Sequence, residues 1–280
     1  MIEQFQGQTI QHGKFNDRIY LMKLNPDGAE NVPEKLIGMA QSMKYSKIFA
    51  KSGQRQLPVF IDQEFTVEAV IPGYFKGQED LFMVCYYLRE DRGIETRAKE
   101  YERVLNVAKS KAHEPPRQKN ERSAFTIRAC DAGDIPQMAD IYRQVFPSYP
   151  FPIHDPDYLQ KTMTGNVDYY CVESHGDILA LSSAEVDHTA KSAEMTDFAT
   201  LPENRKKRLA GRLLSVMETE TAKKGIKTFY TIARAISYGM NITFARDGYM
   251  FGGRLKNNTN ISGDIESMNI WYKRVNGHNA

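Results

Sequence analysis

A strand, a tight turn and a basic helix start follow one another in residues 193–214, and this stretch constrains the fold most. β-forming and polar residues alternate over residues 193–200, which predicts a short strand. The strand breaks at Leu201-Pro202. An amphipathic helix follows, because apolar residues then recur at helical spacing. These are Leu209, Leu213, Val216 and Met217.

Four consecutive cations, Arg205 to Arg208, occupy the turn, and Arg212 follows one helical turn later. The first amides of a helix have no partner within the helix, so they attract anions. Cationic side chains at the same point add to that attraction. The stretch therefore predicts a phosphate-binding turn, and the alternative is a solvated basic helix start.

The charge balance argues that this anion site is local. The chain has 280 residues and a net charge of +2, which is too small for the global basic field of a nucleic-acid binder. Cys85, Cys130 and Cys171 lie far apart and predict reduced thiols. The first residues have no leader pattern, and no apolar run approaches membrane-spanning length. We expect a soluble cytoplasmic protein with no membrane or nucleic-acid partner.

The length suits two domains. Residues 1–113 predict a small α+β domain, with strands at 18–24, 45–51 and 81–88, a short strand at 59–61, and helices at 33–43 and 92–111. No catalytic constellation stands out there, and we assign the domain a structural or substrate-covering role. Residues 114–123 are polar, contain Pro115-Pro116 and predict a linker. Residues 124–280 form the second domain.

The order of elements in the second domain, β-α-α-β-β-β-α-β-α-β-β, resembles the GCN5-related N-acetyltransferase (GNAT) family. In this sequence Arg205 takes the Arg/Gln place of the family's acetyl-CoA motif, and Ala210 takes its final small position. A second signature begins at Asn241 and ends at Gly248-Tyr249. The resemblance implies an α/β (α+β) fold with a mixed, mostly antiparallel central sheet, behind a smaller α+β domain.

Residues 237–272 are similar to the C-terminal part of the beta-lysine N-acetyltransferases, which belong to the same superfamily. An Asn-rich stretch at 252–260, expected to form a long turn, and a strand at 266–271 carry this likeness. The resemblance implies transfer of the acetyl group of acetyl-CoA to the ε-amine of β-lysine or of a similar small amine, with no metal. It leaves open whether the chain forms a homodimer.

The resemblance also implies a coenzyme site along the strand, the turn and the next helix. Lys206 and Arg208 depart from the family, which commonly has glycine at these positions, and Phe244 stands where many members have a tyrosine. The expected cofactor-binding residues are Phe198, Ala199, Thr200, Arg205, Lys206, Lys207, Arg208, Leu209, Ala210, Gly211, Asn241 and Phe244.

An alkylammonium has a pKa near about 10.4, so acetyl transfer needs a base. Glu194 and Asp197 are the candidates, and their spacing of three on a strand predicts that only one faces the cleft. We select Glu194 as the base and Asp197 for substrate binding. Tyr249 or Tyr238 could donate the proton that Phe244 cannot, and Tyr249 is selected. Arg234, just after a strand, is expected to bind a substrate carboxylate.

Three other functions stay open at this point. A peptide or protein amine acetyltransferase would need an open groove, whereas the aromatic-rich segment 147–156 favours a closed pocket. The missing glycines would also fit a non-catalytic acyl-CoA-binding module with a degenerate site. Nucleic-acid binding through residues 205–212 is disfavoured by the net charge and by the absence of aromatic residues among the cations.

Overall fold

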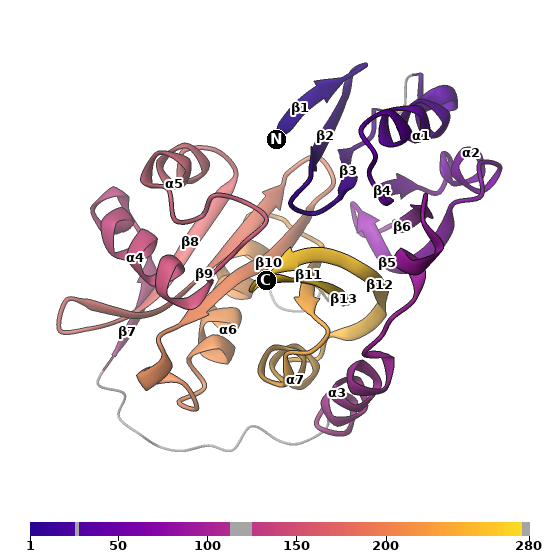
Figure 1. Cartoon of the computed structure of the whole chain (residues 1–280). Coiled ribbons are helices and arrows are strands. Elements are labelled where there is room, and N and C mark those ends of the chain that lie inside the picture. The colour runs from indigo at the N-terminus through magenta and orange to yellow at the C-terminus, as the bar shows by residue number, and fades with distance from the viewer. Residues whose placement is uncertain (26–27, 113–124, 276–280) are drawn as a thin grey trace.

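The computed structural model describes residues 1–25, 28–112 and 125–275, and its strands form one 13-stranded sheet (Figure 1). The strand order is β1-β2-β3-β4-β6-β5-β12-β13-β11-β10-β9-β8-β7. Among the described strands, only β3–β4 and β10–β11 pair in parallel. The sheet is therefore mixed and mostly antiparallel, as expected from the sequence.

The N-terminal half of the sheet carries three helices. Its strands are β1 (Ile2–Phe5), β2 (Gln8–Gly13), β3 (Arg18–Lys23), β4 (Lys47–Gly53), β5 (Thr66–Phe75) and β6 (Glu79–Tyr87). The helices are α1 (Val32–Ser42), α2 (Leu57–Ile61) and α3 (Ala98–Ser110). The predicted strand at 59–61 is wrong: this run is helical because Pro58 occupies the first helical turn, where its fixed φ favours a helix.

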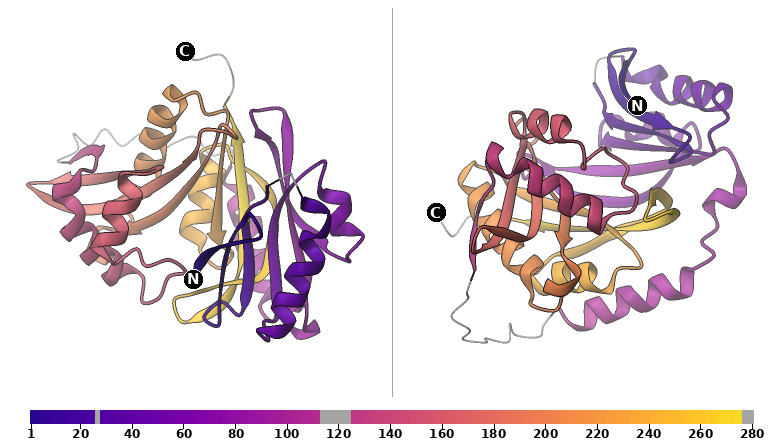
Figure 2. Two further views of the ribbon diagram at one scale, coloured as in Figure 1. Left: turned by 90° about the horizontal axis from the view of Figure 1, so that it is seen from above. Right: turned by 60° about the vertical axis from the view of Figure 1, so that its left-hand side comes forward.

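The C-terminal half follows the predicted order of elements. Its strands are β7 (Thr126–Ala129), β8 (Val167–Ser174), β9 (Asp177–Asp187), β10 (Ser192–Thr200), β11 (Thr228–Arg234), β12 (Met250–Ile261) and β13 (Asp264–Arg274). The helices are α4 (Ile135–Val145), α5 (Pro156–Met163), α6 (Leu209–Lys223) and α7 (Tyr238–Arg246). Side chains alternate along β8, so Cys171 packs with α4 and α5 on one face. Val172 packs with α6 on the other. The helices thus lie on both faces of this part of the sheet (Figure 2).

The two halves join where β12 pairs with β5, at Gly253 and Ala69. Gly253 has a φ of 138°, and a Cβ there would lie 2.2 Å from the carbonyl oxygen of Glu68. Only glycine allows β5 to approach this closely. A buried ion pair between Lys47 and Glu68 (3.3 Å) lies beside the junction, and Lys47 also donates to the Lys256 carbonyl at 2.6 Å.

The Asn-rich stretch at 252–260 is not the expected turn. It belongs to strand β12, whose pairing with β13 shifts register between Leu255 and Thr259. The extra residues bulge toward the N-terminal half, where the Asn257 side chain donates to the carbonyl oxygens of Arg92 (3.0 Å) and Ile94 (2.9 Å). The asparagines therefore tie the two halves together.

The predicted linker at 114–123 lies outside the described residues. Helix α3, which precedes it, packs against α7 rather than against its own half, so the division into 1–113 and 124–280 stays a prediction. Within the described residues, no helix combines the length and the apolar character needed to cross a membrane.

Candidate active site

Strands β10 and β11 separate after a short region of pairing. They pair in parallel only at Ser192–Thr228, Ala193–Phe229 and Glu194–Tyr230. Beyond this point β10 continues along β9, and β11 continues along β13. The facing edges of the two strands therefore leave unpaired backbone groups between them, which a ligand with amide groups can bind in the manner of a strand.

A β-bulge lies just beyond this separation. The register between β10 and β9 shifts between Thr196 and Ala199, and Asp197 has a φ of 55°. The bulge turns the Asp197 side chain to the face that carries Glu194. The prediction that only one of these two carboxylates faces the cleft is therefore wrong, because strict alternation does not hold across a bulge.

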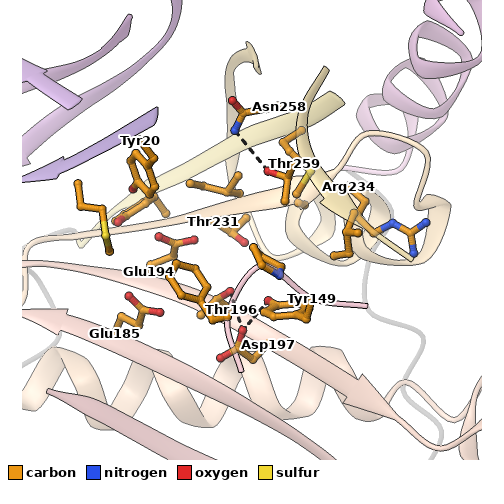
Figure 3. Close-up of a pocket in the computed structure, with 18 of the residues that line it drawn as sticks. Tyr20, Tyr149, Glu185, Glu194, Thr196, Asp197, Thr231, Arg234, Asn258 and Thr259 are labelled. Carbon is orange, nitrogen blue, oxygen red and sulfur yellow. Dashed lines mark hydrogen bonds between the residues drawn. The ribbon is translucent and has the colours of Figure 1, made fainter. Parts of the chain in front are cut away.

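A cavity of about 440 Å³ lies between the two halves of the sheet, and Glu194 and Asp197 both line it (Figure 3). Strands β9 and β10 provide an acidic wall with Glu185, Glu194 and Asp197. The facing wall comes from the N-terminal half and carries the cations Arg18 and Lys51 among aromatic rings. The cavity therefore has walls of opposite charge.

Glu185 and Glu194 are register partners on the two antiparallel strands. Burial, together with the nearby charges of Glu194 and Asp197, raises the pKa of Glu185 to about 8. Burial also raises the pKa of Glu194, although Lys51 and Tyr230 oppose the shift. The pair can therefore retain a proton near neutral pH and accept one from a bound amine.

Asp197 is held by three hydroxyl groups. Its carboxylate oxygens accept from Tyr149 (2.5 Å), Ser183 (2.6 Å) and Thr196 (3.3 Å). Its side chain is only 9% exposed, and burial raises its pKa. The expected substrate contact at Asp197 is thus replaced by internal hydrogen bonds, and the residue positions Tyr149.

Lys51 comes from β4 and lies among phenol rings. Its ammonium donates to the Tyr230 hydroxyl at 3.0 Å and lies 5.7 Å from the ring centroid of Tyr20. Burial alone would lower the pKa of Lys51, but Tyr20, Tyr74 and Glu194 raise it overall. The residue therefore stays protonated and favours the ionised form of Glu194.

The aromatic segment before α5 closes one side of the cavity, as expected. Tyr149 and Pro150 line the cavity, and the Gln11 amide of β2 donates to the Pro150 carbonyl at 2.9 Å. On the other side, the backbone amide of Gly263 donates to the hydroxyl of Ser148 at 2.8 Å. Contacts from both halves of the sheet thus hold the segment over the cavity.

The basic turn after β10 keeps a backbone conformation that glycine favours. Lys206 and Arg208 have φ values of 65° and 60°, in the left-handed region. Helix α6 begins at Leu209, and its first helical hydrogen bond is from the Arg212 amide to the Arg208 carbonyl. The three amides before Arg212 are the unsatisfied donors of a helix start. Because the cationic side chain at the N-cap carries no acceptor, these donors are left for an anion.

Two of the four cations bend back onto the turn. Arg205 donates to the Thr200 carbonyl at 3.3 Å, and Lys207 donates to the side-chain oxygen of Asn204 at 2.7 Å. Both side chains are exposed. They stabilise the turn, and the backbone amides are the better-placed donors for phosphate.

Phe198 and Phe244 both line the cavity and meet edge to face, with ring centroids 5.6 Å apart. Asn241, by contrast, is fully buried and does not line the cavity. Its amide nitrogen donates to the carbonyls of Arg234 (3.0 Å) and Ser237 (2.7 Å), and its oxygen accepts from Trp271 (2.9 Å). The expected coenzyme contact of the Asn241 side chain is corrected: it shapes the β11–α7 connection.

The structure does not bring Tyr249 to the cavity. Its ring packs against Phe244 in the core beneath α6 and α7, with centroids 5.1 Å apart. Burial and the nearby Glu218 raise the pKa of Tyr249 well above its usual value. A buried phenol with a raised pKa outside the cavity cannot serve as the acid. Tyr238, the alternative, is 40% exposed and does not line the cavity either.

Arg234 lines the cavity but already has a carboxylate partner. Its guanidinium makes two hydrogen bonds to Glu266, at 2.6 and 2.8 Å, and a third to Ser262 at 3.0 Å. The expected carboxylate clamp is therefore satisfied within the protein. Arg234 therefore lies in the cavity wall, as predicted. Its guanidinium is bound to Glu266 and is not available to bind a substrate carboxylate, which the sequence did not predict.

Sequence reasoning missed Glu185, Tyr149 and the cationic wall. Glu185 could have been found, because counting back from Glu194 through the β9–β10 hairpin places the two residues opposite each other. No local signal marks Arg18 or Lys51, which lie in ordinary strands and reach the cavity only through the joining of the two halves.

Comparisons with known proteins cover nearly the whole chain. The chain is 40% identical over 272 residues to a beta-lysine N(6)-acetyltransferase of Methanococcus maripaludis, covering 97% of this chain and 98% of that protein. It is 34% identical over 269 residues to the N-acetyltransferase YodP of Bacillus subtilis, covering 95% and 96%. A beta-lysine N(6)-acetyltransferase of Methanosarcina mazei is 37% identical over 204 residues, 72% of this chain and 73% of that one. No family model matches.

Solved structures match a little more than half of the chain. The ribosomal-protein-S18-alanine N-acetyltransferase of Escherichia coli has a TM-score of 0.48 and 17% identity, and covers 56% of this chain and 98% of its own. A spermidine N-acetyltransferase SpeG of Vibrio cholerae has a TM-score of 0.47 and 19% identity, and covers 55% and 95%.

The identity to the Methanococcus maripaludis and Bacillus subtilis proteins extends over both halves of the sheet, including the strands that form the cationic wall. The chain is therefore an acetyltransferase and belongs to the beta-lysine N(6)-acetyltransferase family.

Proposed function

We propose that this protein transfers the acetyl group of acetyl-CoA to the ε-amine of β-lysine, giving N6-acetyl-β-lysine. Two of the relatives carry this activity in their names. The observation that carries the proposal is the cavity that the aromatic segment covers on one side, with carboxylates Glu185 and Glu194 on one wall and cations on the other. β-Lysine has two ammonium groups and one carboxylate, so it needs both kinds of wall.

The coenzyme fits two features of the described chain. The unpaired edges of β10 and β11 beyond Glu194 offer backbone groups to the amides of a pantetheine arm. The amides of Leu209, Ala210 and Gly211 at the start of α6 suit its pyrophosphate. The left-handed backbone at Lys206 and Arg208 supports this site despite the missing glycines.

The chemistry requires a neutral amine. In our proposal Glu194, paired with Glu185, takes a proton from the ε-ammonium, and the amine nitrogen then attacks the thioester carbonyl carbon. The carbon–sulfur bond then breaks as the nitrogen loses its second proton, and the leaving thiolate takes up that proton to form the thiol of coenzyme A. A thiol has a reference pKa near about 8.5, so its departure at neutral pH depends less on a dedicated acid than the amine depends on a base. The reaction can therefore proceed although Phe244 has no hydroxyl group to donate a proton to the thiolate.

The cover over the cavity also argues against the two alternative functions, a protein acetyltransferase and a degenerate binding module. A lysine side chain of a protein would have to enter past the segment that Gln11 and Gly263 hold in place. A degenerate binding module gives no reason for a buried pair of carboxylates beside the separated strands. Both observations favour a small amine and a catalytic role. A cytoplasmic location, where free thiols persist, stays our prediction.

The test is coenzyme A release with a panel of amines comprising β-lysine, α-lysine, spermidine and a lysine-containing peptide. We expect the highest kcat/KM with β-lysine and no turnover of the peptide. Turnover of the peptide without turnover of β-lysine would reverse the assignment. A failure of acetyl-CoA to raise the melting temperature would support the degenerate module instead.

A further inference from the structure

Arg18 is a buried cation for which the described residues provide no ion-pair partner. Its side chain is 3% exposed, at the start of β3, and it lines the cavity. The nearby Arg92 has its own carboxylate, Asp17, at 3.4 Å. Burial lowers the pKa of Arg18 to about 10, so the guanidinium stays charged at neutral pH. A buried charge without a counter-ion is costly, and a bound anion would offset that cost.

The contacts of Arg18 leave the Nε of its guanidinium without a partner in the described chain. Within the described chain, its hydrogen bonds come from Nη1 and go to the Asn258 carbonyl and to Oγ1 of Thr259, the latter at 3.1 Å. The unpartnered Nε is also buried. The side edge of a guanidinium matches the two oxygens of a carboxylate.

An unpaired acceptor lies next to this donor. The side-chain oxygen of Asn258 is buried and has no hydrogen-bond partner in the described residues, although its amide nitrogen lies 3.4 Å from Oγ1 of Thr259. Figure 3 shows Asn258 and Thr259 across the pocket from Glu185 and Asp197. A donor for a carboxylate and an acceptor for an ammonium thus lie together, away from the acidic wall.

We propose that Arg18 and Asn258 form the subsite for the amino-acid head group of the acceptor, in which Arg18 binds the carboxylate and Asn258 accepts from the adjacent ammonium. This inference rests on the proposed function and adds the residues that select an amino acid over a simple diamine. Lys51 is a weaker candidate, because Glu194 and three phenols already surround its charge. The guanidinium carbon of Arg18 lies 5.5 Å from the centroid of the Tyr20 ring, so Arg18 belongs to the N-terminal wall. A head group bound to Arg18 would lie on that wall.

The test compares binding of β-lysine with that of β-lysinamide, which replaces the carboxylate by a neutral amide. Calorimetry in the presence of coenzyme A gives the two dissociation constants without any turnover. We expect the wild-type protein to bind β-lysine at least about tenfold more tightly. Arg18→Gln should raise the Kd of β-lysine by about 10–100-fold and change that of the amide less than about threefold, because only β-lysine loses charge-assisted hydrogen bonds to its carboxylate.

Asn258→Asp provides a second variant that does not leave Arg18 uncompensated. The new carboxylate should pair with Arg18, preserve the melting temperature and still weaken β-lysine binding by about tenfold or more. Lys14→Gln removes a cation from the exposed turn before β3 and is the control, for which neither Kd should change.

Each outcome bears on the subsite separately from the reaction. Equal losses for both ligands in Arg18→Gln, or equal wild-type affinities, would overturn the subsite. So would a failure of both ligands to bind. Tight, Arg18-dependent binding of β-lysine without coenzyme A release would support the subsite and reject the proposed reaction.

Discussion

Glu194 and Glu185 stand directly opposite each other on β10 and β9, and both side chains line the cavity. Like charges in directly opposed positions of a sheet are destabilising. The arrangement is therefore costly for stability unless one of the two carboxyls keeps its proton. The cost is consistent with a site built to exchange protons with a bound amine.

Replacing Glu194 tests the base directly. We expect Glu194→Gln to lower kcat by about 10²–10⁴-fold, the usual contribution of a general base, with the affinity for acetyl-CoA unchanged. Glu34→Gln, on the exposed face of α1, is the matched control and should retain full activity. A Glu194→Gln enzyme with wild-type kcat would show that another group takes the proton.

Glu185 should set the pH dependence of the reaction. Its pKa is about 8, and once it ionises its charge makes Glu194 a stronger base, so kcat/KM should rise with pH and level off above about pH 8. In Glu185→Gln the repulsion on Glu194 disappears, the pKa of Glu194 falls, and the rise should move to lower pH. An unchanged profile would mean that the two carboxyls do not interact.

The raised pKa of Glu185 also makes the stability of the fold depend on pH. A carboxyl whose pKa is raised in the folded state binds more protons there than in the unfolded chain, so stability falls as pH rises between its two pKa values. For Glu185 this window runs from its ordinary value near 4.5 to about 8. Glu185→Gln should therefore raise the melting temperature most above pH 8 and least below pH 4.5. Thermal unfolding followed by circular dichroism at several pH values checks the difference.

The elements of the C-terminal half could be predicted because each depends on local patterns. Alternation predicts β10, helical spacing predicts α6, and the cations of the turn mark the helix start. The site could not be predicted to the same extent. Asp197 reaches the cavity through a bulge, and the alternation along β10 does not show where the register shifts.

The N-terminal wall of the cavity could not be predicted from local sequence patterns for a different reason. Arg18 and Lys51 occupy strands whose sequences are typical of any half-buried sheet. Their function depends on β5 joining β12, a contact between residues about 180 positions apart, which no local pattern encodes. The prediction that Tyr249 is the acid is wrong for the same reason. Its position in the family signature can be recognised in the sequence, but its burial beside Phe244 depends on the tertiary structure.

The left-handed turn makes a testable prediction about Arg208. A residue with a side chain is strained there by about 1 kcal/mol relative to glycine. Arg208→Gly should therefore raise the melting temperature and leave the affinity for coenzyme A equal or higher. Arg208→Ala removes the same charge but keeps the strain, so it separates the two effects. Loss of coenzyme A binding in both variants would assign the side chain itself to the phosphate.

The close approach at Gly253 makes a prediction about both stability and activity. A Cβ there would lie 2.2 Å from the Glu68 carbonyl oxygen and 2.6 Å from the Cα of Ala69, so Gly253→Ala forces β12 away from β5. Overpacking of this kind costs about 1–3 kcal/mol, and the positive φ adds to it.

The activity of Gly253→Ala should fall even where the protein stays folded. The pairing of β5 with β12 makes the cationic and acidic walls parts of one sheet, so the separation should raise the KM of the amine by about tenfold or more while the KM of acetyl-CoA stays constant. Gly38→Ala, in α1 with no atom within 4 Å of the added Cβ, is the control and should be neutral or stabilising. Equal changes in both KM values would show instead that the spacing of the two halves affects coenzyme binding as much as amine binding.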